Sequence, residues 1–323
     1  MTVADASVPM QQEREPVVLQ AEAPMPCSAG LSTASLWSCV NQFLESEPNN
    51  RTLLGHIRAQ EAPVCDLPSA FDAVPLLDLV SQHVQIVWFI DYDGTLSPIV
   101  EDPDRAFLPS ATHDTLVELA RTQKVAIVSG RARKKLQTFV NIPDVYLAGS
   151  HGFDITGPEG SLVHHQVAEK FLPQLRDAQA VIELQIQDIP GCHIEDNWLA
   201  FSVHWRRADP ADVARIERAV DEVVENSQFL RKTHGKCVFE VRPKIDWDKG
   251  RAVDWLLSAL ELNHPRVLPI YIGDDKTDED AFRVLRARGL ACVVGGAQDT
   301  HQTAAHFRLE DPMAVERFLR HFC

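Results

Sequence analysis

The sequence predicts an α/β fold in which a smaller α+β unit interrupts a parallel-sheet domain. Short apolar runs at residues 86–90, 124–128 and 145–148 alternate with helical patterns, which is typical of a parallel sheet covered by helices. The alternation resumes after residue 249, whereas residues 161–241 contain strand patterns with a period of two. The chain has 323 residues, of which 45% are hydrophobic, and this is long enough for both units.

The first 64 residues are expected to form a disordered N-terminal extension. Residues 1–34 are rich in Pro, Ala, Gln, Glu and Ser and have little periodicity, whereas residues 36–44 have the spacing of a short amphipathic helix. Several acids and the lack of a basic segment before an apolar one argue against a secretory signal or a transit peptide.

Charge and cysteine usage exclude several classes of protein. The formal net charge of -15 argues against nucleic acid or an anionic membrane as the main partner. The sequence has no run of 18 apolar residues, so we expect no transmembrane helix. Seven scattered cysteines without a Cys-x-x-Cys pair indicate neither a disulfide framework nor a zinc site, so we expect a cytoplasmic protein. Nothing in the sequence identifies a protein partner.

The parallel-sheet domain is expected at residues 65–160 and 242–323. Its first part contains a helix at 71–82, the strand at 86–90 and a helix at 112–121. The strand at 124–128, a basic helix with apolar Leu136, Phe139 and Val140, and the strand at 145–148 follow. The second part is expected to contain, in order, a helix at 249–260, a strand at 268–272, a helix at 281–288, a strand at 290–294 and a helix at 314–320.

The inserted unit at residues 161–241 is expected to mix helices with a sheet that has one wet face. The predicted elements are helices at 168–187 and 209–226 and strands at 192–197, 199–206 and 237–242. Alternation in the second strand places His204 and Arg206 on its polar face. The same alternation places Glu240 on the polar face of the last strand.

Two carboxylates follow the first buried strand directly. Asp91 and Asp93 stand two residues apart, ahead of Gly94 and Thr95. Open α/β sheets bind ligands at the carboxyl ends of their strands. Because a pair of acids there is costly without a cation or a proton, the segment predicts a bound metal and a carboxylate that attacks the substrate. An ordinary acidic turn is the alternative explanation.

A second acidic segment, at the end of the strand at 268–272, extends this prediction to a magnesium site. Hard oxygen ligands suit Mg²⁺, and Asp91, the backbone carbonyl of Asp93 and Asp274 would supply them. Asp275 and Asp278 are further candidate ligands from the same segment.

The remaining chemistry suits phosphoryl transfer to an aspartate, with Asp91 as the nucleophile. Asp93 could protonate the leaving oxygen and later deprotonate the hydrolytic water. Ser129 and Lys249 could bind phosphoryl oxygens. Taken alone, Ser129 could be an N-cap and Lys249 a solvated lysine; the joint occurrence in one order favours catalysis.

These motifs resemble those of known phosphatases. Asp91-Tyr-Asp-Gly-Thr, Ser129-Gly-Arg, Lys249 and Gly273-Asp-Asp-Lys-Thr-Asp278 resemble the four motifs of the haloacid dehalogenase-like phosphatases. Residues 241–250 and 273–280 narrow the resemblance to the trehalose-6-phosphate phosphatases, especially plant-like forms, and it extends over residues 66–323. It implies a Rossmann-like core, an inserted cap, a magnesium cofactor and a small-molecule substrate, trehalose 6-phosphate, which is hydrolysed to trehalose and phosphate.

The resemblance also implies that the cap reads the sugar. Its recognition residues would fall at Glu195, Arg206, Lys236 and Glu240, with Asn197 and His204 nearby and Arg131 as a candidate from the core. These side chains could equally be an ordinary solvated sheet face. Two functional alternatives stay open: a related capped sugar phosphatase, for example one for sucrose 6-phosphate, and a non-catalytic sugar-phosphate sensor. The presence of both Asp91 and Asp93 argues against the sensor.

Overall fold

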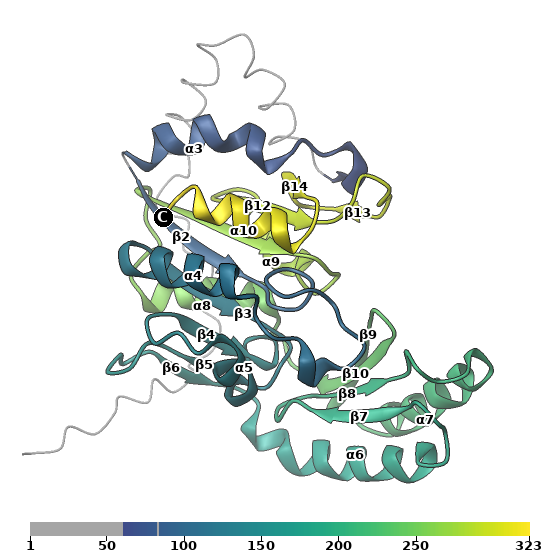
Figure 1. The fold of residues 1–323 in the computed structure, drawn as a ribbon. Helices are drawn as coiled ribbons and strands as arrows, with labels where there is room; N and C mark the ends of the chain where they lie inside the picture. Colours follow the sequence, from purple (N-terminus) through teal and green to yellow (C-terminus); the bar gives the residue numbers. More distant parts are fainter. Residues whose placement is uncertain (1–60, 83) are drawn as a thin grey trace, which may run out of the picture.

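The computed structural model describes residues 61–82 and 84–323 (Figure 1). The expected N-terminal disorder and the helix at 36–44 therefore lie outside the described residues, except for residues 61–64. There, β1 (Ala62–Pro63) pairs with β13 (Gln302–Thr303), and Val64 is buried. The fold thus begins before residue 65, the expected start of the core.

The described residues include a large sheet of eight strands, which runs through the centre of the upper part of Figure 1. In spatial order its strands are β14 (Phe307–Leu309), β12 (Leu290–Val294), β11 (Val267–Gly273), β2 (Gln85–Ile90), β3 (Lys124–Val128), β4 (Tyr146–Gly149), β5 (Asp154–Thr156) and β6 (His164–Gln166). The first six strands run parallel to one another. Strand β5 pairs antiparallel with β4, and β6 pairs antiparallel with β5.

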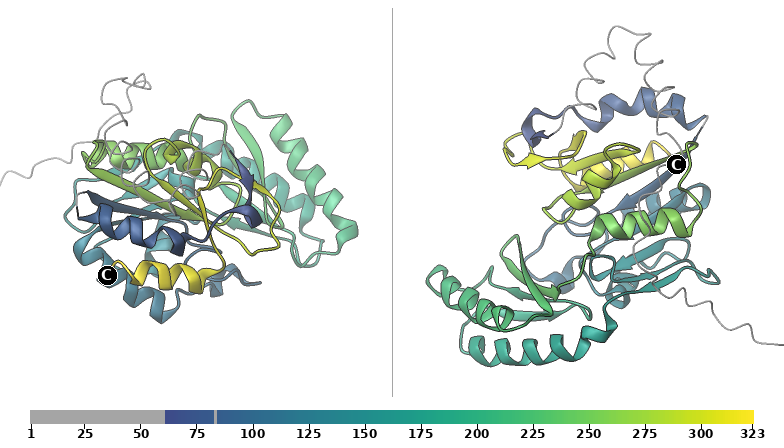
Figure 2. Two further views of the ribbon diagram at one scale, coloured as in Figure 1. Left: turned by 90° about the horizontal axis from the view of Figure 1, so that it is seen from above. Right: turned by 180° about the vertical axis from the view of Figure 1, so that it is seen from behind.

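Helices cover both faces of this sheet (Figure 2). One face carries α3 (Val74–Ser81), α4 (Ser110–Thr122), α5 (Arg133–Val140) and α10 (Pro312–Arg320), and the other carries α8 (Lys249–Ala259) and α9 (Glu279–Leu285). Trp88 and Ile90 of β2 face the first set, and Val87 and Phe89 face the second, which explains the uninterrupted apolar run. None of the described helices is long and apolar enough to cross a membrane.

The register of the central strands brings three motifs to one edge. In the parallel ladders Ile272 of β11 pairs with Ile90 of β2, which pairs with Ile127 of β3. Asp91, Asp274 and Ser129 therefore emerge side by side from the carboxyl ends of neighbouring strands.

A second sheet forms the lower part of Figure 1, and we call residues 172–243 the cap. Its four described strands are antiparallel, in the order β7 (His193–Asp196), β8 (Phe201–His204), β10 (Val238–Pro243) and β9 (Leu230–Gly235). Helices α6 (Leu172–Ile186) and α7 (Val213–Glu225) pack on one face, through a core that includes Phe201, Val203 and Phe239. The face of the cap sheet that carries no helix lies toward the carboxyl edge of the large sheet.

The cap differs from the prediction in three details. Strand β8 ends at His204, so Arg206 lies in the following turn and not on the expected strand face. Strand β9 was not predicted, because its side chains are mostly polar on both faces. Strand β6 belongs to the large sheet, which therefore continues past residue 160, the expected boundary.

The aromatic contact between α10 and β2 gives a first prediction. Phe318 is fully buried, and its ring lies 5.7 Å from that of Phe71 and 6.2 Å from that of Trp88. We expect Phe318→Ala to lower the free energy of unfolding by about 3–5 kcal/mol, because the cavity cannot fill. Urea denaturation measures this loss. Met313→Ala on the exposed side of the same helix, where the residue is 68% exposed, is the control and should change it by less than about 0.5 kcal/mol.

Candidate active site

Three buried carboxylates gather at the carboxyl edge of the large sheet. Asp91 follows β2, Asp274 follows β11, and Asp278 precedes α9. One oxygen of each lies within 4.8 Å of the others. Carboxylates this close in a buried place repel one another unless cations compensate them.

Lys249 provides one of the compensating charges. Its Nζ atom lies 2.7 Å from Oδ1 of Asp91 and 2.8 Å from Oδ1 of Asp278. The lysine is the first residue of α8, where the helix dipole disfavours a cation, so these two carboxylates must stabilise it. Burial alone would lower the pKa of Lys249, but Asp278 and Asp91 outweigh it and raise the pKa well above its ordinary value.

Asp278 also organises the loop that carries its neighbours. Its Oδ1 accepts a hydrogen bond from the Tyr271 hydroxyl at 2.6 Å, and its Oδ2 accepts from the backbone N–H groups of Asp274 and Asp275 at 3.1 Å. The Asp275 carboxylate is held instead by the N–H and hydroxyl of Thr277, both at 2.7 Å. Asp275 is therefore outside the group of three, although the sequence also made it a candidate ligand.

The donor set fits a hard divalent cation. Burial raises the pKa of Asp91 well above its ordinary value, although the charge of Lys249 acts to lower it. The neighbouring carboxylates raise this pKa further. Burial likewise raises the pKa of Asp274 to about 7, although Lys236 opposes it. A magnesium ion has oxygen ligands at 2.0–2.1 Å, so ligands on opposite sides lie about 4.2 Å apart, close to the spread observed here.

Asp93 and Arg131 form a bidentate pair beside this group. The guanidinium donates to both Asp93 oxygens, at 2.7 and 2.6 Å. It also packs on the rings of Phe139 and Tyr92, at 4.9 and 5.5 Å. Ser129 is buried behind them, and its hydroxyl accepts from the Arg131 backbone N–H at 3.2 Å. The pair is geometrically fixed, since two hydrogen bonds and two ring contacts restrain one side chain.

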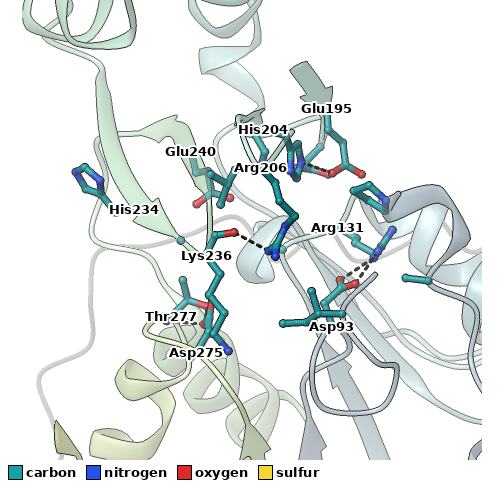
Figure 3. A pocket seen from close by; sticks show the side chains of 18 of the residues that line it. Asp93, Arg131, Glu195, His204, Arg206, His234, Lys236, Glu240, Asp275 and Thr277 are labelled. Atoms are coloured by element: carbon teal, nitrogen blue, oxygen red, sulfur yellow. Dashed lines mark hydrogen bonds and ion pairs between the residues drawn. The ribbon is translucent and has the colours of Figure 1, made fainter. Parts of the chain in front are cut away.

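A cavity of about 210 Å³ lies between the core and the cap (Figure 3). Of the residues that the sequence predicted, those that line it are Asp91, Asp93, Arg131, Glu195, Asn197, His204, Arg206, Lys236, Glu240, Lys249, Asp274 and Asp275. Ser129 and Asp278 are not among the lining residues and support the wall from behind. The fold thus brings the predicted residues of both units to one place.

The cap contributes one row of polar side chains. Cross-strand pairing aligns Glu195 with Ser202, Ser202 with Glu240 and Glu240 with Thr233. His204 binds Glu195 at 2.9 Å. Burial opposes ionisation of Glu195, but His204 and Lys135 outweigh it and lower its pKa to about 2. Both glutamates are therefore held as anions, because opposing charges also lower the pKa of Glu240 against its burial.

Ion pairs close the cap over the core. Lys236 of the cap lies 2.6 Å from Asp274 Oδ2, and Lys135 of the core contacts Glu195. Arg206 donates from Nη2 to the backbone oxygen of Lys236 at 3.0 Å, which Figure 3 shows on the cap side of the cavity. Lys236 and Glu195, both predicted to read the sugar, thus already have partners in the core.

Sequence reasoning missed several lining residues, notably His151, His193, Thr233 and Thr277. His151 lies within the residues that resemble the family, but the sequence assigned no role to it. Thr233 lies on β9, a strand that was not predicted. Its neighbours in the sequence are polar too, so no alternation of apolar and polar residues indicates a strand there. The period of two in β7 could have indicated His193, which shares a face with Glu195.

The sequence of this chain is similar to those of known proteins. Residues 89–313 match the family model described as trehalose-phosphatase. Trehalose 6-phosphate phosphatase RA3 of Zea mays is 41% identical over 266 residues, which cover 78% of this chain and 74% of that protein.

Solved structures are similar to this chain as well. The C. albicans trehalose-6-phosphate phosphatase C-terminal domain superposes with a TM-score of 0.67 at 26% identity, over 78% of this chain and 96% of that chain. A haloacid dehalogenase-like hydrolase from Bacteroides thetaiotaomicron shares the fold alone, with a TM-score of 0.51 and 13% identity over 74% of this chain and 100% of that chain.

Close packing at Gly94 gives a second prediction. Gly94 has φ +84°, and a Cβ atom there would lie 2.3 Å from Oδ2 of Asp274. Gly160 has φ +79° with no atom within 4 Å of such a Cβ, so it controls for backbone strain. We expect Gly160→Ala to cost about 1–2 kcal/mol of unfolding free energy. Gly94→Ala should cost a further 1–3 kcal/mol or so in urea denaturation, because the added methyl displaces a carboxylate held by Lys236. Equal losses in the two variants would contradict the packing argument.

Proposed function

Because the chain belongs to the trehalose-phosphatase family, we propose that it hydrolyses trehalose 6-phosphate to trehalose and phosphate through an aspartyl phosphate on Asp91. The observation that carries this proposal is the place of Asp91: a buried carboxylate at the end of β2, facing a cavity that the cap closes. Few other functions would require two further carboxylates and a buried lysine around it.

We assign the attack to Oδ2 of Asp91, since Oδ1 accepts from Lys249. As the bond from Oδ2 to phosphorus forms, the bond from phosphorus to the sugar oxygen breaks, and that oxygen takes a proton from Asp93. Water then attacks the same phosphorus, gives its proton to Asp93 and releases phosphate, which restores the Asp91 carboxylate. Lys249 remains against Asp91 throughout and stabilises the negative charge of the transferring group.

Arg131 determines how Asp93 acts in this scheme. It holds both Asp93 oxygens in the present conformation, where the carboxyl group is placed as a base. To act as an acid, Asp93 must carry a proton, so the bidentate contact has to loosen as the substrate phosphate enters. The phosphate offers Arg131 an alternative anionic partner of matching geometry.

Magnesium fits the same arrangement. We propose that Asp91, Asp274 and the backbone carbonyl of Asp93 hold the ion, with Asp278 fixing the Asp274 loop. When bound, the ion neutralises charge between the attacking carboxylate and the phosphoryl group. Asp275 has a supporting part in this scheme, because Thr277 already engages its carboxylate.

The cap supplies the sugar-binding groups in this proposal. Glu195, Glu240 and His204 present charged or imidazole groups to the cavity, and disaccharide hydroxyls bind such groups well. Lys236 contacts Asp274 of the core, and Arg206 donates to the Lys236 backbone, so both are assigned to the substrate phosphate or its first ring. Asn197 donates to Ser202 at 3.1 Å, and its buried Oδ1 has no partner among the described residues, so it is available to a hydroxyl group.

We also propose that the enzyme acts in the cytoplasm. The five cysteines in the described part of the chain are free thiols, as a reducing compartment would keep them.

The nucleophile is tested by Asp91→Asn. We expect phosphate release from trehalose 6-phosphate to fall by about 10³-fold or more, because an amide cannot form the acyl phosphate. Intact-protein mass spectrometry of acid-quenched wild type should detect an added phosphoryl group, absent from the variant. Lys249 keeps Asp278 as its partner, so thermal unfolding should show a folded variant. A phosphorylated Asp91→Asn protein would remove Asp91 from this role.

The substrate is tested in the same assay. The wild type should hydrolyse trehalose 6-phosphate with a higher kcat/KM than sucrose 6-phosphate, glucose 6-phosphate or an aryl phosphate. Clearly better turnover of another sugar phosphate would reject the trehalose assignment and favour a related capped phosphatase.

Metal removal gives a further prediction. Treatment with a chelator should abolish turnover, and added Mg²⁺ should restore it, because the crowded carboxylates lose their compensating charge. Calorimetric titration of the chelated protein with Mg²⁺ should show one site, which Asp274→Asn weakens. Full activity after chelation, checked by elemental analysis, would refute the metal requirement.

A further inference from the structure

The turn after β4 has an unusual backbone. Ser150, His151 and Gly152 all have positive φ, at 49°, 55° and 87°. Side-chain-bearing residues adopt this left-handed region at a cost, and strain of this kind persists only where surrounding contacts enforce it. Two backbone hydrogen bonds do so: the Ser150 N–H donates to the Arg131 oxygen at 2.7 Å, and the His151 N–H donates to the Ser129 oxygen at 2.9 Å. The turn is therefore tied to the loop that carries Ser129 and Arg131.

The same turn reaches the cap through two side chains. The Ser150 hydroxyl donates to the backbone oxygen of Asn197. Nε2 of His151 lies 2.5 Å from Oε1 of Glu240, and both side chains are buried. Glu240 is an acceptor in its ionised form, so Nε2 carries the proton and donates. The other oxygen of Glu240 accepts from the Thr233 hydroxyl at 3.1 Å.

The ring of His151 has little freedom to leave this position. A Cβ atom on Gly130 would lie 2.9 Å from Nε2 of His151, so the ring packs directly over that glycine. His151 also lines the cavity, and its Nδ1 atom is buried without a partner among the described residues. It thus stands between the Ser129–Arg131 loop of the core and the polar row of the cap.

We propose that His151 is a positioning residue that fixes the Glu240 carboxylate from the core side and thereby sets the preference for the capped sugar substrate. This inference rests on the proposed function of the cavity, because Glu240 is assigned there to the sugar. The contact joins residues of two units, so it forms only when the cap is closed over the core. Glu240 is then held between His151 and Thr233, with its remaining lone pairs directed by both partners.

Two substitutions separate the contact from the backbone strain. Asn tolerates positive φ, so His151→Asn should keep the turn, but its amide ends about where Nδ1 stands and cannot reach Glu240. The amide nitrogen of His151→Gln stands near the position of Nε2 and can donate to Glu240. Circular dichroism and thermal unfolding of both variants verify that they are folded.

The measurement is kcat/KM for trehalose 6-phosphate relative to an aryl phosphate, which has no sugar hydroxyl for Glu240 to bind. We expect His151→Asn to lower this ratio about tenfold or more, mainly through KM for the sugar phosphate, as expected for loss of a charge-assisted hydrogen bond. His151→Gln should recover most of the loss. In a double-mutant cycle, His151→Asn should lower the ratio less than about threefold when Glu240→Gln is already present.

The inference is overturned by an unchanged ratio in His151→Asn, by no recovery in His151→Gln, or by the same loss with and without Glu240→Gln. If the wild type prefers another sugar phosphate, the trehalose assignment fails. The double-mutant cycle is then run with that preferred substrate. A failed substrate assignment is thus distinguished from a failed role of His151. A wild type that hydrolyses no sugar phosphate better than the aryl phosphate would overturn the role of His151 as well.

Discussion

The buried ammonium of Lys249 between Asp91 and Asp278 is the interaction on which the core depends. It joins the start of α8 to residues that follow β2 and β11, so one charge ties together segments that are distant in the sequence. Removing one partner of a buried ion pair generally costs about 3–5 kcal/mol, because the other charge is left uncompensated. The charges assigned to the proposed reaction are thus also the charges that hold the carboxyl edge of the sheet in shape.

Much of the fold followed from the sequence because the central strands are buried on both faces. Such strands are uninterrupted apolar runs, and the structure places β2, β3 and β12 within one residue of their predicted limits. The α/β fold, the family and the phosphatase class are all confirmed by the comparisons. Strand β9 was missed for the opposite reason, since Lys232 on its inner face pairs with acids of α7 and leaves no apolar period.

The individual roles within the site remain predictions, although their spatial grouping was readable from strand ends. What the sequence could not indicate were contacts between distant side chains. Arg131 was expected to bind substrate, yet it is paired with Asp93, 38 residues away. Glu195 was expected to bind the sugar, and Lys135 reaches it from the core, 60 residues away. Such pairings depend on how the cap sits over the core, and the hydrophobic periodicity of the sequence does not indicate that arrangement.

The polar row of the cap is encoded in one continuous stretch of the chain, whereas the groups proposed for bond breaking lie on either side of it. A single exchange of genetic material across that stretch would therefore replace the whole wall proposed to face the sugar and leave the groups proposed for the reaction intact. Evolution can diversify selectivity in such an architecture by swapping an interchangeable module, instead of accumulating coordinated changes throughout the gene.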